Sequence, residues 1–117
     1  MCAWWTGPWP KDDIYKPHAH SCGETLMFFG SDINNPRDLG GEVEFWIEDE
    51  KYLITKSCTI FIPPMLQHAP MWTKKVNSPI LFVGVVALAG ETTYYSRDPK
   101  FKDFQDPPGG DKILWID

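Results

Sequence analysis

An all-β fold is predicted for this chain, and two features of the sequence predict it. Eleven prolines and nine glycines are spread along 117 residues, so few stretches are long enough for a helix without a residue that breaks it. Between these breakers lie about seven short runs rich in β-branched and aromatic residues, which is typical of a sandwich or a barrel. The length suits one domain over residues 1-117, because a chain of this size buries a single hydrophobic core.

The N-terminal part contains the first extended segments. Residues 1–10 carry three tryptophans and two prolines, which predicts an extended segment held in place by burial of aromatic side chains. Residues 14–20 form a short extended piece, and residues 24–30 form a strand ended by glycine. Turn-forming residues fill positions 31–41, so we expect a loop there that shapes the mouth of a site.

The remaining strands follow at short intervals. Residues 42–48 partly alternate acidic and apolar side chains, and residues 51–55 are the return strand of a hairpin. Residues 58–62 form a strand that two prolines stop. The apolar run 79–88 has no polar face, so a strand there should be covered on both sides. A final strand is predicted over residues 112–116.

The composition and charge exclude several kinds of partner. The net charge of −5 and the pI near 5.1 argue against nucleic acid and anionic membrane surfaces, since both reward clustered lysine and arginine. No apolar run is long enough to cross a bilayer as a helix, and the N-terminus lacks the features of a signal peptide. The three cysteines have no Cys-x-x-Cys spacing, which indicates neither a disulfide framework nor a thiolate zinc site. We therefore expect a protein of the reducing cytoplasm.

The three histidines of the chain indicate a metal site. His18 and His20 stand at positions i and i+2 of an extended segment, so in a strand both imidazoles point to the same face. Glu24 follows shortly after them, and His68 comes after the strand that the prolines stop. Imidazole nitrogens and a carboxylate oxygen suit Fe, Mn, Zn, Ni or Co. A lone His-x-His pair is usually incidental, but the four residues together predict one bound divalent metal ion.

The same residues resemble the two signature motifs of the cupin superfamily. His-x-His-x3-Glu-x5-Gly, residues 18–30, is similar to the first motif, and Pro-x4-His, residues 63–68, is similar to the second. The resemblance spans residues 18–72 and implies a double-stranded β-helix, the cupin jelly-roll barrel, as a single cupin domain. It also implies that the metal ligands are His18, His20, Glu24 and His68.

The chain departs from the family pattern at positions that do not supply a ligand. Gly30 comes one residue early, and Ser57 stands where the second motif opens with glycine. Met65 replaces the glycine after proline, and Trp72 replaces the final asparagine.

Several side chains near these motifs have two interpretations. Trp72, Phe28 and Met65 are candidates for the lining of a substrate pocket. Aromatic side chains more often form the core, and we expect this of most of the larger set, which is Phe28, Phe45, Trp46, Phe61 and Phe82. For Cys22 and Cys58, packing is favoured over coordination or redox chemistry.

Two reaction classes and one binding role follow from such a site. As a Lewis acid, the metal would act on a small oxygenated organic substrate in a lyase or isomerase reaction. As a redox-active ion, it would support a dioxygenase reaction. Glu24 could also leave the metal and act as a base. The third hypothesis is a non-catalytic domain that binds a small ligand; the lack of an attached output domain favours an enzyme.

A homodimer is also expected. The chain before His18 is short compared with the strands that usually precede the first cupin motif. A terminal strand or a partner subunit would then complete a sheet edge.

Overall fold

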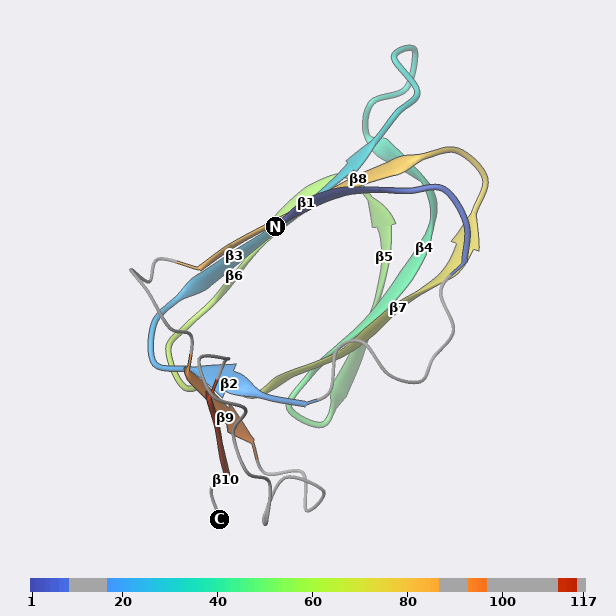
Figure 1. Ribbon diagram of the computed structural model, residues 1–117. Helices are drawn as coiled ribbons and strands as arrows, with labels where there is room; N and C mark the ends of the chain where they lie inside the picture. The colour runs from blue at the N-terminus through green and yellow to red at the C-terminus, as the bar shows by residue number, and fades with distance from the viewer. Residues whose placement is uncertain (9–16, 87–92, 97–111, 116–117) are drawn as a thin grey trace.

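The computed structural model describes residues 1–8, 17–86, 93–96 and 112–115, which contain strands and no helix (Figure 1). Within these residues there is accordingly no helix long and apolar enough to cross a membrane. The all-β prediction is confirmed. The strands are β1 (Cys2–Trp5), β2 (Ala19–His20), β3 (Glu24–Gly30), β4 (Asp38–Ile47), β5 (Glu50–Lys56), β6 (Cys58–Ile62), β7 (His68–Val76), β8 (Ile80–Val86), β9 (Thr93–Ser96) and β10 (Lys112–Trp115).

The strands form two larger antiparallel sheets and one small sheet. The four-stranded sheet has the order β1-β8-β3-β6, and the three-stranded sheet has the order β5-β4-β7. In Figure 1 these two sheets lie as facing layers, and the small sheet β10-β9-β2 lies at one end of them. Among the described residues no strand pair joins the two larger sheets, so they are two facing layers and not a closed barrel.

The strand pairs are nested along the chain. β2 pairs with β9, β3 with β8 and β4 with β7, each antiparallel. β5 and β6 stand at the centre of this nested order. The chain is therefore a long hairpin with paired arms that folds over on itself, so that β6 lies beside β3 and β5 lies beside β4.

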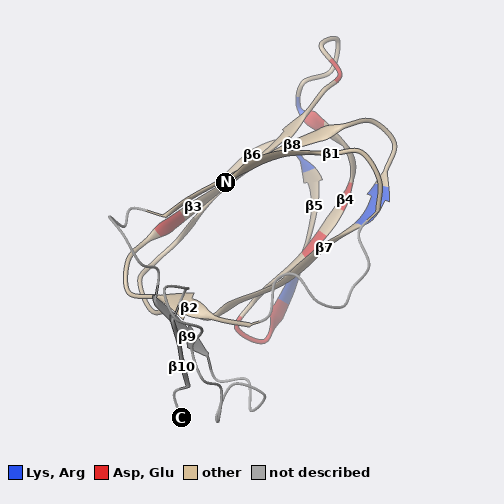
Figure 2. Ribbon diagram, in the orientation of Figure 1, with Lys and Arg blue, Asp and Glu red and all other residues tan. Residues whose placement is uncertain are grey.

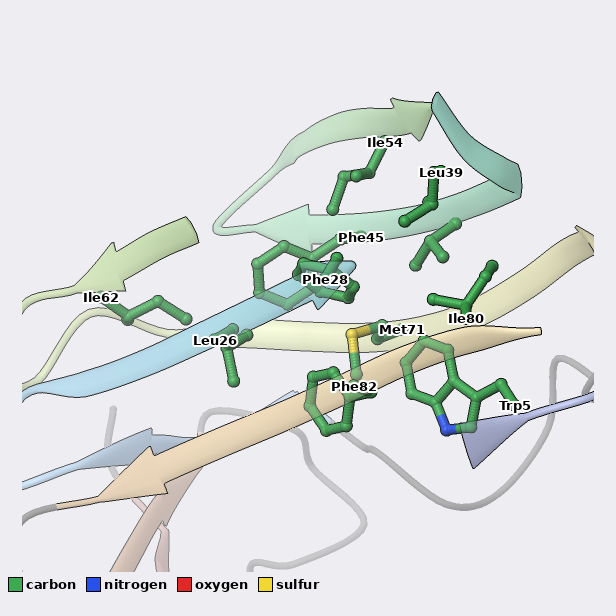
Figure 3. Close-up of a cluster of buried hydrophobic side chains, with 11 residues drawn as sticks. Trp5, Leu26, Phe28, Leu39, Phe45, Ile54, Ile62, Met71, Ile80 and Phe82 are labelled. Carbon is green, nitrogen blue, oxygen red and sulfur yellow. The ribbon is translucent and has the colours of Figure 1, made fainter. Parts of the chain in front are cut away.

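The inward side chains of the two layers form one hydrophobic core (Figure 3). Trp5 stacks on Phe82 with ring centroids 4.6 Å apart, and Phe28 lies against both rings. Trp5 is only 1% exposed, which confirms that aromatic burial holds the N-terminal segment. A fully buried phenylalanine contributes about 1.5–3 kcal/mol to stability, so this aromatic group is a principal anchor of β1.

The predicted loop over residues 31–41 is too long at its C-terminal end. β4 begins at Asp38, so Gly40 and Gly41 belong to a strand. A Cβ atom on Gly41 would lie 2.3 Å from the carbonyl oxygen of Lys75. Glycine here marks a close approach between β4 and β7 and not a loop.

Two expectations of burial are also wrong. β8 is not covered on both faces, because Val85 is 48% exposed on the outer side of its sheet. Phe61, expected in the core with the other aromatic residues, is 64% exposed. Both side chains point outward because they alternate with inward residues along their strands.

Most other element predictions agree with the structure. The hairpin of residues 42–48 and 51–55 corresponds to β4 and β5, and the predicted strands over 24–30 and 58–62 are β3 and β6. The final strand is present as β10. Residues 9–10, 14–16, 87–88 and 116 of the predicted segments lie outside the described residues.

Candidate metal site

The four candidate ligands meet where segments of all three sheets end or begin (Figure 1). His20 is the last residue of β2, Glu24 is the first of β3, and His68 is the first of β7. His18 forms an isolated antiparallel bridge with His68, with backbone N···O distances of 2.8 and 2.9 Å. Backbone hydrogen bonds therefore hold the two motif segments side by side, independently of the contacts between their side chains.

Glu24 lies at the centre of the cluster. Its Oε2 atom is 2.8 Å from Nε2 of His68 and 3.0 Å from Nε2 of His20. The ring centroid of His18 lies 4.5 Å from that of His68 and 4.9 Å from that of His20. All four ligand atoms lie within 4.8 Å of one another. The predicted convergence of these four residues is confirmed.

The orientation of His68 is fixed by a backbone group that sequence reasoning missed. Nδ1 of His68 lies 2.9 Å from the carbonyl oxygen of Leu66. Because a carbonyl oxygen only accepts hydrogen bonds, Nδ1 donates a hydrogen to it, and Nε2 is the nitrogen turned toward the cluster. Histidine ligands of metals usually have such a partner. The one sequence signal for it is the position of Leu66 two residues before the histidine.

The surroundings of Glu24 keep its carboxyl group ionised. Burial alone would raise its pKa, but hydrogen bonds and electrostatic attraction from His20 and His68 outweigh burial and lower the pKa to about 2. A carboxylate with so low a pKa is a weak base at neutral pH.

The donor set fits a divalent transition metal. Three imidazoles and one carboxylate are the ligands that zinc, iron, manganese, nickel and cobalt accept in proteins. His20 and His68 are 3% exposed, so water has little access to displace them. The cluster could therefore hold one ion.

The three residues expected in a substrate pocket lie in separate places. Phe28 is fully buried in the core. Met65 is 43% exposed, and its backbone N–H donates to the carbonyl oxygen of His20 at 2.7 Å. Trp72 is buried opposite Glu44 on the face of its sheet turned away from the core. The structure does not bring them together, and their pocket role stays a prediction.

A shallow depression of about 480 Å³ that is open to solvent lies between β5 and β6, and sequence reasoning missed it. Two strand pairs lead from it to the cluster, because Ile47 pairs with His68, and Ile60 lies two residues before Ile62, the partner of Glu24. The lining is mostly apolar and consists of Ile47, Tyr52, Leu53, Ile54, Thr55, Lys56, Cys58 and Ile60.

Comparison with known proteins does not identify a family for this chain. A scan against protein-family models found no match, and a search of curated proteins found no relative. The motif residues and their geometry therefore carry the argument about function.

Proposed function

We propose that this protein is a cupin-type metalloprotein in which His18, His20, Glu24 and His68 hold one divalent cation. The observation that carries the proposal is their convergence: all of the ligand atoms lie within 4.8 Å of one another. Both the sequence spacing and the spatial arrangement point to the same four side chains.

The nested strand order supports the cupin part of the proposal. A double-sheet jelly roll arises when a long antiparallel hairpin folds over into two facing layers. The pairs of β2 with β9, β3 with β8 and β4 with β7 follow that order. In such a fold the two motif segments lie at neighbouring strand ends, as the bridge between His18 and His68 requires.

The chemistry best supported is Lewis-acid catalysis on a small oxygenated molecule, of the lyase or isomerase type. A bound cation supplies stabilisation of the negative charge that develops on a substrate oxygen. Residues of the chain would position the ligands and offset part of the charge of that ion. The carbonyl oxygen of Leu66 fixes the ring of His68, and the Glu24 carboxylate would offset one positive charge.

Metal content tests this proposal. We expect about one equivalent of a divalent metal in anaerobically purified protein by elemental mass spectrometry, and a sharp loss in His68→Ala and Glu24→Gln, because each variant removes a ligand. Glu42→Gln is the matched control, since it makes the same change in β4, and should keep the metal.

The outcomes separate the candidate functions. Zinc would support Lewis-acid catalysis, and redox-active iron would place a dioxygenase reaction first. A protein that lacks metal and takes up none on addition would refute the metalloprotein proposal and leave a ligand-binding domain.

A further inference from the structure

Among the residues that the structure describes, the outer face of the four-stranded sheet carries no charged side chain. An antiparallel sheet with one face on the core usually has polar residues on its other face. Here Glu24 is the one charged residue in the four strands, and it faces the metal cluster. The strand register places the following residues on the outer face: Cys2, Trp4, Thr25, Met27, Phe29, Thr59, Phe61, Leu81, Val83 and Val85.

The other sheet of the molecule shows the ordinary pattern. In Figure 2 β4 carries acidic segments, β7 carries basic segments and β5 carries both, whereas β1, β8 and β6 carry none. Large apolar side chains of the uncharged face are open to solvent: Phe61 is 64%, Trp4 is 58% and Phe29 is 38% exposed. A contiguous exposed apolar patch on one face marks an interaction surface.

We propose that this outer face, formed by β1, β8, β3 and β6, is the interface with a second copy of the same chain. The net charge of −5 makes two copies repel, and a face without acidic side chains is where they can meet with the least repulsion. The face has few polar groups, so a polar partner would leave its own hydrogen-bonding groups unpaired. An identical face on a two-fold axis brings equally few polar groups to the interface, so few hydrogen-bonding groups are left unpaired.

The area of the face agrees with a dimer. At their observed exposures, the three aromatic residues present about 350 Å², and the neighbouring aliphatic side chains bring this to about 500 Å² per copy. Two copies would then bury about 1,000 Å², the area at which a specific interface becomes plausible. Two such sheets stack about 10 Å apart, as the layers of a sandwich do.

Charged substitutions on this face test the proposal. By size-exclusion chromatography with light scattering, we expect the unaltered protein to be a dimer at about 100 µM. Phe61→Lys and Val85→Lys should each raise the dimer dissociation constant about 30-fold or more, because the dimer would bury an unpaired charge. Both side chains point to solvent, so neither change removes a core contact; circular dichroism checks the fold of each variant.

Leu53→Lys is the matched control. Leu53 is 52% exposed on β5 of the other sheet, and the substitution changes the net charge by the same amount. It should leave the dimer intact. A monomeric unaltered protein, outer-face variants that dimerise normally, or an equal effect of Leu53→Lys would each overturn the proposal. None of these positions is a candidate metal ligand, so the result is independent of the metal test.

Discussion

Met65 has a backbone conformation that favours glycine, at the position where the second cupin motif has glycine. Its φ is 64°, and its side chain is 43% exposed. A left-handed conformation costs a residue with a Cβ about 1–2 kcal/mol, whereas the greater flexibility of glycine in the unfolded chain offsets about 0.5–1 kcal/mol of the gain. We expect Met65→Gly to increase the free energy of unfolding by about 0.5–1 kcal/mol, measured by urea denaturation.

Met65→Ala is the control for this residue, because it removes the same side chain and keeps the Cβ. It should give no increase in stability. Equal stabilities of the glycine and alanine variants would contradict the argument from backbone strain. The result also bears on the site, because the N–H of Met65 donates to the carbonyl oxygen of His20.

At the scale of elements, Gly30 sets the distance between the end of β3 and the start of β4. A Cβ atom there would lie 1.9 Å from the carbonyl oxygen of Asp38, so the backbone of β4 must move to admit alanine. We expect Gly30→Ala to lower the free energy of unfolding by about 1–3 kcal/mol, measured by chemical denaturation.

Gly7→Ala is the matched control for Gly30→Ala, because a Cβ at Gly7 would meet no atom within 4 Å. It should leave stability nearly unchanged. If the two alanine variants unfolded at the same denaturant concentration, the close approach at Gly30 would not limit the packing of β3 on β4.

The elements differ in how far their sequences predict them. β3 and β6 are compact runs of β-branched and aromatic residues between turn formers, so local pattern is sufficient. β7 was not predicted, because Pro70 interrupts it and prolines precede it. Its extended state comes from pairing with β4. The β propensity of the residues within one segment does not include such a long-range interaction.

The candidate site shows the same division. The spacing of His18, His20 and Glu24 is local, so the sequence alone places these side chains near one another. His68 is joined to them in the sequence only as the remaining histidine of the chain and through the motif resemblance, because the bridge to His18 depends on the fold of the whole chain. The contact of His68 with the backbone carbonyl of Leu66 does not depend on the side chain of Leu66, so the pattern of residue types does not predict it.

At the scale of the whole molecule, the layers and their exposed face depend on strand order. Hydrophobic pattern predicts an all-β fold, but it does not state which strands are neighbours. The run 79–88 is the clearest case, because its uniform apolarity predicts burial on both faces. The structure buries one face of β8 and leaves the other open. Apolar residues on the open face are the ones we assign to contact with a second copy.

The site also links the three sheets, so metal binding should stabilise the molecule as a unit. His20, Glu24 and His68 belong to three different sheets, and one ion bound by all of them would add a link to the backbone bridge, the side-chain contacts and the packing that already join these strands. A ligand at 100 times its dissociation constant stabilises the folded state by about 2.7 kcal/mol. For a domain of this size we expect a rise in melting temperature of roughly 10 °C on addition of zinc or manganese, measured by differential scanning calorimetry.

His68→Ala should show no rise in melting temperature on addition of the metal, and Glu42→Gln should show the full rise. An equal rise in His68→Ala would mean that the ion binds elsewhere, and the site would then not be the link between the sheets.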